Sequence, residues 1–234
     1  MKPCPPTTML ILAIDTSWKQ GSLALARGDA QSFELLETAS LTGGAFSAEL
    51  VPQIASALAR RNLRKQEIDA FVAVSGPGSF TGLRVGLAAI KGLVEVLKKP
   101  IATVSVLEAL AVASGVSGRV FAALDAQRGE VFLGEYDVQS GTLQARSLQT
   151  ESLFTREAFL AALPMGATVV TPDASIAALM PAGTTVFQIR RPGVEAIARI
   201  GLRKILTGQT TSAEDLDANY VRRSDAEIFS KSSS

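Results

Sequence analysis

One short segment constrains this chain more than any other: Ser-Gly-Pro-Gly-Ser-Phe-Thr-Gly-Leu-Arg-Val-Gly at residues 75–86. It follows an apolar run at 71–74 and leads into a longer one at 87–97. This order predicts a buried strand, a tight Gly/Pro connection and a helix. Ser79 and Thr81 are both suited to cap that helix. The glycines allow another group to approach the backbone closely.

Three kinds of group can approach these glycines: a phosphate, the chain's own core or another protein. The start of a helix after a glycine-rich turn can bind an anion. The segment lacks the Gly-Lys-Ser/Thr ending of a P-loop, and no acidic residue ends a strand about 20 residues later, as in a dinucleotide fold. Close packing on the chain's own sheet is an equally good interpretation. The candidate residues of this signature segment are Gly76, Pro77, Gly78, Ser79, Thr81, Gly82 and Arg84.

The composition excludes several classes of enzyme. The 234 residues contain no histidine and a single cysteine, Cys4. Ser-His-Asp catalysis, Cys-His catalysis and every metal site with a histidine ligand are therefore excluded, which leaves only an all-oxygen metal site. A hydrophobic content of 47% indicates a globular protein with a substantial core. A net charge of +1 gives no general attraction to nucleic acid.

The same features lead us to expect a cytoplasmic protein. One cysteine cannot form an internal disulfide, which suits a reducing compartment. The apolar run at 9–14 is too short for a signal peptide and is followed at once by Asp15. No apolar run reaches the roughly 18 residues of a membrane span, so no membrane association is expected.

The two halves of the chain carry similar patterns. Strands are predicted at 9–15, 21–27, 33–39 and 68–74 in the first half, and at 120–125, 130–136, 167–171 and 185–189 in the second. In each half the first strand ends in an aspartate and the second strand returns as the other arm of a hairpin, with 18–20 as the turn in the first half. The continuous apolar character of 68–74 is typical of a central, parallel strand.

Two further helices are predicted. One runs from Ser47, its cap, to about Arg61, with Phe46 and Val51 as a hydrophobic staple. The other occupies 193–206 and is stopped by Gly208.

Two related α/β halves that each open with an Asp-terminated hairpin indicate the two-lobed, duplicated fold of actin, Hsp70 and sugar kinases. This ASKHA fold has mixed sheets and flanking helices. We expect a loose leader at 1–8, a first lobe at 9–112, a second lobe at 113–225 and a disordered tail at 226–234.

Asp15 and Asp125 are the candidate polar residues of the cleft between such lobes. Carboxylates at these positions can hold a magnesium ion or orient a water beside a nucleotide phosphate. An aspartate at the end of a strand also commonly caps its own turn, and the spacing alone favours this second interpretation.

The helix after the signature segment is apolar over most of its circumference. Only residues 84, 91, 95 and 98 form a narrow polar stripe. Such a helix must be buried on more than one side, and we favour a protein partner for the side away from its own sheet. An ordinary three-layer core is the alternative. The candidate partner-interface residues are Leu50, Ile54, Leu58, Leu83, Leu87, Ile90 and Val94.

Two basic groups remain. Tyr220-Val221-Arg222-Arg223 can touch RNA phosphates, although a solvated surface is the commoner role for two arginines. Arg60, Arg61, Arg64 and Lys65 gather at a predicted helix end, where positive charge favours the helix dipole.

Three segments together resemble the bacterial TsaB (YeaZ) family. They are Ile-Leu-Ala-Ile-Asp-Thr-Ser at 11–17, the signature segment at 75–86, and Leu-Asp-Ala-Gln-Arg-Gly-Glu-Val-Phe at 124–132. The ordered match covers about residues 9–135, and Asn-Tyr-Val-Arg at 219–222 resembles the family's ending.

The resemblance implies a non-catalytic subunit in the synthesis of N6-threonylcarbamoyladenosine (t6A) at position 37 of tRNA. Such a subunit binds a catalytic paralogue, TsaD, works with the ATPase TsaE, and forms a homodimer when alone. Its tRNA contact is expected to be indirect or weak. ATP or ADP is expected only at the level of the complex, with Asp15, Thr16 and Asp125 as vestiges of a nucleotide site.

Two departures from related proteins bear on cofactors. TsaD-type paralogues hold a metal with two histidines on the first helix, where this chain has Phe46 and Glu49. No metal centre is therefore expected, and the same absence argues against a metalloprotease. The segment Thr171-Pro172-Asp173-Ala174 stands where kinase-like members have a glycine-rich adenosine loop, so tight ATP binding is not expected. The alternative is an autonomous ATPase or kinase that uses Asp15 and Asp125.

Overall fold

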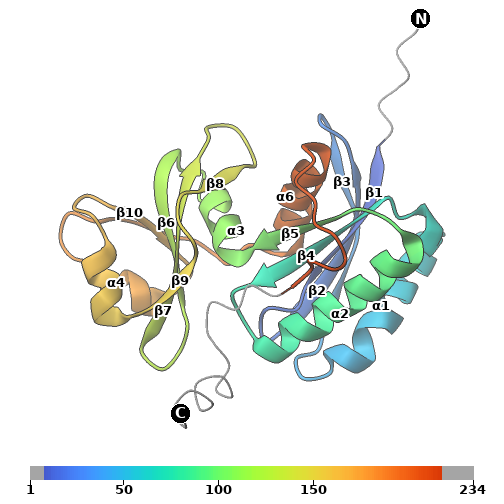
Figure 1. Cartoon of the computed structure of the whole chain (residues 1–234), viewed down its shortest axis with the longest axis horizontal. Coiled ribbons are helices and arrows are strands. Elements are labelled where there is room, and N and C mark those ends of the chain that lie inside the picture. The colour runs from blue at the N-terminus through green and yellow to red at the C-terminus, as the bar shows by residue number, and fades with distance from the viewer. Residues whose placement is uncertain (1–7, 218–234) are drawn as a thin grey trace, which may run out of the picture.

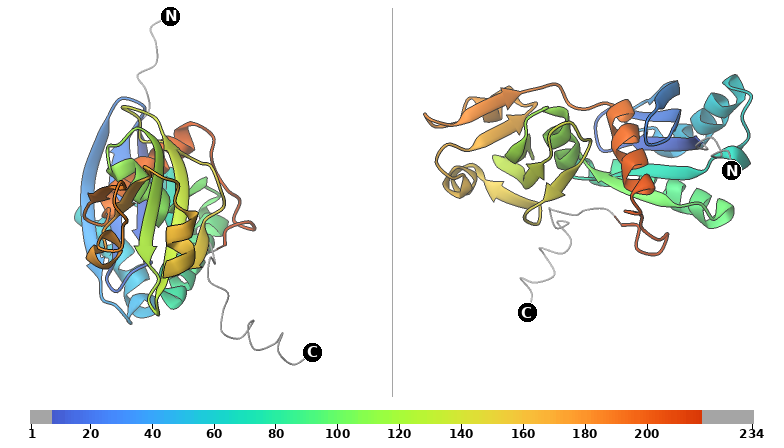
Figure 2. Two further views of the ribbon diagram at one scale, coloured as in Figure 1. Left: turned by 90° about the vertical axis from the view of Figure 1, so that its left-hand side faces the viewer. Right: turned by 90° about the horizontal axis from the view of Figure 1, so that it is seen from above.

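The computed structural model describes residues 8–217, which form two β-sheets lying side by side along the long axis of the molecule (Figure 1; Figure 2). The expected two-lobed α/β architecture is therefore confirmed. Cys4, the basic segment at 220–223 and the expected tail at 226–234 lie outside the described residues.

The first sheet has the strand order β3-β2-β1-β4-β5. Its strands are β1 (Met9–Asp15), β2 (Gly21–Gly28), β3 (Phe33–Leu41), β4 (Ala70–Gly76) and β5 (Ile101–Ser105). Strand β2 runs antiparallel to both β1 and β3, whereas β4 lies parallel to both β1 and β5. The prediction of a central, parallel strand at 68–74 is confirmed in β4, which begins and ends two residues later, and its apolar run is buried on both faces of the sheet.

Helices cover both faces of this sheet. Helices α1 (Phe46–Arg60) and α2 (Phe80–Leu97) lie next to each other on one face, while α6 (Val194–Leu206) crosses the other (Figure 1). A Cβ on Gly201 of α6 would lie 2.3 Å from the Val72 side chain of β4, so this glycine allows α6 to pack closely on the sheet. A short 3₁₀ turn, Lys65–Glu67, leads from α1 into β4.

The second sheet has the order β11-β10-β6-β7-β8, with β9 also paired to β7. Its strands are β6 (Gly118–Asp125), β7 (Glu130–Val138), β8 (Ala145–Ser147), β9 (Ser152–Thr155), β10 (Thr168–Thr171) and β11 (Thr185–Gln188). As predicted, β6 and β7 form an antiparallel hairpin that repeats the β1–β2 hairpin. The helices of this lobe are α3 (Val106–Ala113), α4 (Arg156–Ala162) and α5 (Ala174–Ala177).

Side chains of β6 alternate between two cores. Val120 and Ala122 join α3 in a large core that continues through the first lobe. Phe121 and Ala123 face the other way and pack with Phe159 of α4 in a smaller core. Because one core runs through both lobes, the lobes are joined by apolar packing as well as by the chain.

Two helices depart from the expected division at residue 112. Helix α3 packs mainly on β6 and β7 of the second sheet, although its residues were expected in the first lobe. Helix α6 lies within the expected second lobe but packs on β1, β4 and β5 of the first sheet. The chain therefore returns to the first lobe near its described end, which adjacency in sequence does not reveal.

The predicted start of the first long helix is corrected in two respects. Ala45, not Ser47, is the N-cap residue of α1, and no side chain caps it; Ser47 lies inside the helix. The Phe46–Val51 staple is also wrong, because Phe46 is buried whereas the Val51 side chain is 61% exposed. The Glu49 carboxylate instead accepts a hydrogen bond from the Thr42 backbone N–H at 2.7 Å.

Candidate functional site

The signature segment forms the connection from β4 to α2. Ser79 is the N-cap residue of α2, as predicted, and its Oγ accepts a hydrogen bond from the Gly82 backbone N–H at 3.2 Å. Thr81 lies inside the helix and is not the cap. The Ser79 backbone N–H donates to the Ser17 backbone oxygen at 2.8 Å. The start of α2 is thus directed at the chain's own backbone just after β1.

Three glycines spaced four residues apart bring α2 close to the two residues after Asp15. A Cβ on Gly78 would lie 2.2 Å from the Ser17 backbone oxygen. A Cβ on Gly82 would lie 2.1 Å from the Thr16 backbone oxygen, and one on Gly86 would lie 2.2 Å from Thr16 Oγ1. Of the alternatives open from sequence, the structure therefore supports packing on the chain's own core.

The seven predicted interface residues do not lie on the surface. Each is at most 6% exposed, because the apolar stripes of α1 and α2 face each other and the sheet. These residues are Leu50, Ile54, Leu58, Leu83, Leu87, Ile90 and Val94. Their assignment to a partner interface is wrong, and the three-layer core alternative describes them correctly.

The outward sides of α1 and α2 are nevertheless rich in small and apolar residues. We call them the outer helix face, made up of Ala48, Val51, Pro52, Ala55 and Ala59 of α1 and Phe80, Ala88, Gly92 and Val96 of α2. Val51 and Val96 are 61% and 72% exposed. The Arg84 guanidinium lies 3.7 Å from the centroid of the Phe80 ring at the start of α2. Exposed apolar side chains gathered on neighbouring helices are typical of a protein-binding surface.

Asp15 and Asp125 hold equivalent turns in the two lobes. Asp15 Oδ1 accepts hydrogen bonds from Ser17 N at 2.8 Å and Ser17 Oγ at 2.5 Å, whereas Asp125 Oδ1 accepts one from Gln127 N at 2.8 Å. Asp15, Thr16 and Ser17 are all buried. The interpretation of each aspartate as a turn cap is confirmed, and the shared geometry supports the duplicated pattern.

Sequence reasoning missed a cation that lies beside the first of these turns. Arg191 follows β11 and precedes α6, and its Nη2 donates a hydrogen bond to Ser17 Oγ at 2.8 Å. Its guanidinium lies 4.7 Å from the centroid of the Trp18 ring. Burial lowers the pKa of Arg191, while the charges of Asp15 and Asp173 act in the opposite direction. An arginine in an irregular segment carries no periodic signal, and its contact with Ser17 depends on the tertiary fold.

Asp173 completes the arrangement from the second lobe. Its Oδ2 accepts a hydrogen bond from the Asp125 backbone N–H at 2.8 Å, so it does not cap α5. Burial raises the pKa of Asp173, and the charge of Asp125 adds to that effect. The segment at 171–174 thus places a carboxylate, and no glycine, beside the turn at Asp125.

Phe46, at the start of α1, is a packing residue. Its Cε1 would lie 2.9 Å from a Cβ on Gly21, and its Cε2 would lie 3.2 Å from a Cβ on Gly82. Both glycines therefore make room for the ring. Among residues 8–217, no three His, Cys, Asp or Glu side chains are grouped so that they can hold a metal ion.

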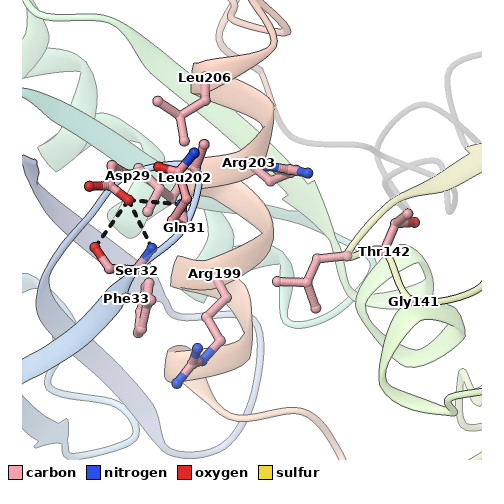
Figure 3. Close-up of a pocket in the computed structure, with 12 residues that line it drawn as sticks. Asp29, Gln31, Ser32, Phe33, Gly141, Thr142, Arg199, Leu202, Arg203 and Leu206 are labelled. Atoms are coloured by element: carbon pink, nitrogen blue, oxygen red, sulfur yellow. Dashed lines mark hydrogen bonds between the residues drawn. The ribbon is translucent and has the colours of Figure 1, made fainter. Parts of the chain in front are cut away.

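A separate pocket of about 260 Å³ lies between the β2–β3 turn, the β7–β8 turn and α6 (Figure 3). Its polar groups are largely engaged. Asp29 Oδ1 accepts hydrogen bonds from the backbone N–H groups of Gln31 and Ser32, and Arg199 pairs with Glu195 and stacks on Phe33. The residues around it offer no pairing of a nucleophile with a base.

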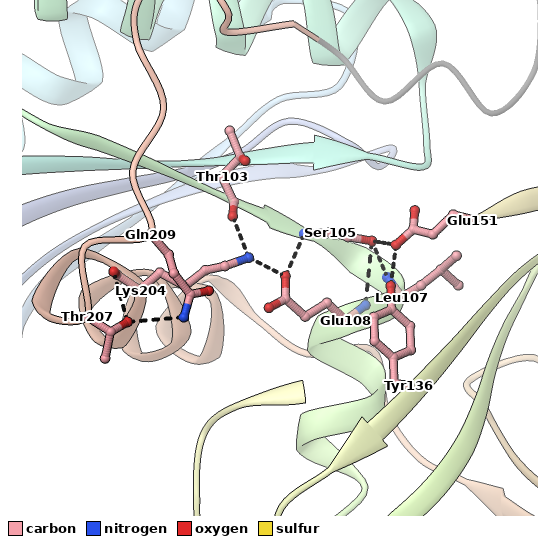
Figure 4. A network of polar contacts seen from close by, with 9 residues as sticks. All are labelled: Thr103, Ser105, Leu107, Glu108, Tyr136, Glu151, Lys204, Thr207 and Gln209. Carbon is pink, nitrogen blue, oxygen red and sulfur yellow. Dashed lines mark hydrogen bonds and ion pairs between the residues drawn. The ribbon is translucent and has the colours of Figure 1, made fainter. Parts of the chain in front are cut away.

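A polar network joins the lobes where β5 meets α3 (Figure 4). Lys204 of α6 forms an ion pair with Glu108 of α3 at 2.7 Å and donates to the Thr103 backbone oxygen at 3.0 Å. The Tyr136 hydroxyl and Ser105 Oγ both donate to Glu151. Burial raises the pKa of Tyr136 well above its usual value. This hydroxyl therefore stays protonated and serves as a structural donor.

None of the helices in residues 8–217 combines the length and the apolar character that crossing a membrane requires.

The comparisons with known proteins bear on this geometry. The family model described as "TsaD: tRNA N6-adenosine threonylcarbamoyltransferase" matches residues 40–199, more than half of the chain. The chain belongs to the TsaD family. Within it, this TsaD-family chain is 36% identical over 138 residues to the "tRNA threonylcarbamoyladenosine biosynthesis protein TsaB" of Bacillus subtilis, and 33% identical over 133 residues to that of Escherichia coli. The resemblance to TsaB proteins is therefore confirmed.

The extent of these matches differs between sequence and structure. The B. subtilis match covers 58% of this TsaD-family chain and 58% of the relative, and the E. coli match covers 55% of each. The chain thus spans little more than half the length of these relatives. YeaZ from Pseudomonas aeruginosa superimposes with a TM-score of 0.72 at 24% identity, over 90% of this chain and 98% of that one. This structural likeness confirms the fold.

Proposed function

We propose that this TsaD-family chain is a non-catalytic subunit in the synthesis of t6A in tRNA, and that it binds a TsaD paralogue. The proposal depends on one observation with two parts. The signature segment packs against the chain's own backbone at residues 16 and 17, and the outer helix face beside it is exposed and apolar. The glycines leave no room for a phosphate at the start of α2, whereas the face beside it is open to another protein. The names of the relatives in B. subtilis and E. coli supply the pathway.

The outer helix face suits a partner of the same fold. Its small side chains, such as Ala55 and Ala88, allow another pair of helices to approach closely. A second copy of this chain can use the same surface in a homodimer, and the paralogue then competes for it. TsaE is proposed to join only the assembled pair, tRNA contact by this chain is proposed to be indirect or weak, and the cytoplasm is the proposed location.

The first prediction concerns binding of the paralogue. The double variant Val51→Glu/Val96→Glu is expected to lower the affinity for a purified TsaD paralogue by roughly 100-fold. The reason is that two charges would be buried without partners at the centre of the interface. Both side chains are exposed in the lone chain, so the fold tolerates the change. Biolayer interferometry gives the affinity, and sedimentation velocity of the lone variant gives its oligomeric state.

Met165→Glu is the matched control, since Met165 is a fully exposed apolar residue of the second lobe. It should bind as the unchanged chain does. Leu87→Glu and Ile90→Glu are unsuitable tests, because both side chains are buried and a charge there would unfold the chain. Unchanged affinity in Val51→Glu/Val96→Glu would show that the partner binds elsewhere.

The second prediction concerns nucleotide. We propose that the lone chain binds no ATP tightly, and that ATP or ADP belongs to the complex. The turn at residues 15–17 is buried, and Asp15 Oδ1 already accepts two hydrogen bonds from Ser17. Isothermal titration of the chain with Mg-ATP should give no one-site binding curve. A micromolar site that Asp15→Asn abolishes would instead support the autonomous ATPase or kinase.

A further inference from the structure

The segment that carries Arg191 is the crossing from the second lobe back to the first. It lies between β11, an edge strand of the second sheet, and α6, which packs on the first sheet. The Arg191 side chain is partly buried, whereas that of its neighbour Arg190 is exposed. Two consecutive arginines thus differ in environment, and only the second enters the cleft.

Arg191 interacts with polar groups of both lobes, by direct contact on the first and through charge on the second. On the first lobe it donates to Ser17 Oγ at 2.8 Å, and that hydroxyl donates to Asp15 Oδ1. On the second lobe, the negative charge of Asp173 favours the protonated guanidinium and acts to raise the pKa of Arg191, and Asp173 Oδ2 accepts the Asp125 backbone N–H. The Trp18 ring lies against the guanidinium and shields one side of it. One permanent positive charge therefore lies near Asp15 of the first lobe and Asp173 of the second.

This arrangement does not fit a magnesium nucleotide. Carboxylates that face a cleft are ordinary ligands for a hydrated divalent cation. Here a guanidinium that stays protonated lies beside them, so a divalent ion would enter against a like charge. The packing of α2 on Thr16 and Ser17 removes the space at the same turn. Cation and phosphate are excluded by separate features of the chain.

We propose that Arg191 is a resident cation between the lobes: its guanidinium supplies the positive charge near Asp15 and Asp173 and thereby disfavours binding of a divalent ion or a nucleotide there. This inference rests on the proposed lack of nucleotide binding by the lone chain. It has a further consequence. With Arg191 replaced by a small neutral residue, Asp15 and Asp173 face a vacated space and form a weak divalent-cation site.

The third prediction tests this role by thermal unfolding of the full chain. Arg191→Ser is expected to lower the Tm by a few degrees, because it removes the hydrogen bond to Ser17 Oγ and the positive charge near two partly or fully buried carboxylates. Millimolar MgCl₂ or CaCl₂ should then raise the Tm of this variant by a few degrees more than NaCl at equal ionic strength does. The unchanged chain should respond equally to the divalent and monovalent salts.

Three variants make the test specific. Arg190→Ser should leave the Tm and the salt response unchanged. Arg191→Lys keeps the charge, so it should retain most of the stability and show no response specific to divalent ions. Adding Asp173→Asn to Arg191→Ser should restore part of the Tm and remove the divalent response, because it relieves the repulsion and removes a ligand. If Arg191→Ser does not fold, the Tm and the salt response are measured on the double variant Arg191→Ser/Asp173→Asn.

Two results would overturn the proposal: a Tm for Arg191→Ser equal to that of Arg190→Ser, or a variant that responds equally to MgCl₂ and NaCl. Binding of the paralogue is measured separately. Arg191 lies outside the outer helix face, so Arg191→Ser should bind the paralogue with unchanged affinity at a temperature where it is folded. A negative result in the thermal unfolding of Arg191→Ser therefore does not affect the proposed binding of the paralogue. Unchanged binding by Val51→Glu/Val96→Glu likewise does not affect the role proposed for Arg191.

Discussion

Replacing Gly82 with alanine is expected to lower the free energy of unfolding by roughly 3 kcal/mol, although alanine is the better helix former. The new Cβ would lie 2.1 Å from the Thr16 backbone oxygen and 3.2 Å from the Phe46 ring. The first of these atoms belongs to the backbone of a buried turn, so it cannot move aside as a flexible side chain can. Urea unfolding followed through Trp18, the chain's single tryptophan, measures the loss.

Gly92→Ala on the same helix is the matched control. A Cβ on Gly92 would meet no atom within 4 Å, and this residue is exposed. The same substitution should therefore stabilise the chain by about 0.5–1 kcal/mol, as expected for an exposed helix interior. A lower free energy of unfolding for Gly82→Ala and a higher one for Gly92→Ala would distinguish the effect of packing from that of helix propensity. Equal effects at Gly82 and Gly92 would contradict the packing role of the signature segment.

Gly86 provides a second test of the same contact. Its Cβ would lie 2.2 Å from Thr16 Oγ1 and 3.4 Å from Thr16 Cγ2, both side-chain atoms. Gly86→Ala should destabilise the chain, and adding Thr16→Ala should restore part of the loss because it removes both atoms. Without that recovery, the loss at Gly86 would have to arise elsewhere.

These glycines show how far sequence reasoning reached at the signature segment. The order of strand, turn and helix and the cap at Ser79 follow from local rules, and the structure confirms them. The choice between a phosphate and the chain's own core does not follow from local rules. It depends on Thr16 and Ser17, which are about 60 residues away in sequence and adjacent in space.

The helix faces were misassigned for a related reason. The apolar stripe through Leu87 and Ile90 was recognised correctly, but periodicity does not say which protein covers a stripe. The exposed face is marked instead by small residues such as Ala55 and Ala88, which a search for large apolar side chains passes over. The start of α3, where no helix was predicted, also had a local signal in the sequence. Ser105 and Glu108 form a capping box that marks the start of α3.

The return of α6 to the first lobe had no local signal. Its helical pattern was predicted, and Gly193 is its N-cap residue. Its docking depends on close contact between Gly201 and Val72, and on Lys204 reaching Glu108 of α3. Contacts between distant segments of this kind also place Arg191 in the cleft, since the segment before α6 must cross from one lobe to the other.

Lys204→Met is expected to destabilise the chain by about 2–4 kcal/mol, since it breaks the ion pair that joins α6 to α3. The Lys204 and Glu108 side chains are only 20% and 11% exposed, so the carboxylate would be left largely out of water with the Ser105 backbone N–H, at 3.4 Å, as its remaining partner (Figure 4). Methionine keeps the length of the apolar stem, which isolates the effect of the charge. Urea unfolding gives the difference in free energy.

Lys98→Met is the matched control, because Lys98 pairs with Glu95 at 3.0 Å on the surface, with side chains 77% and 50% exposed. Such a pair contributes about 0–1 kcal/mol, so its loss should be small and should vanish in high salt. Adding Glu108→Gln to Lys204→Met should recover much of the stability, since the unpaired charge is gone. If the double variant is as unstable as Lys204→Met, the loss arises from the hydrogen bond that Lys204 donates to the Thr103 backbone oxygen, and the ion pair does not hold the lobes together.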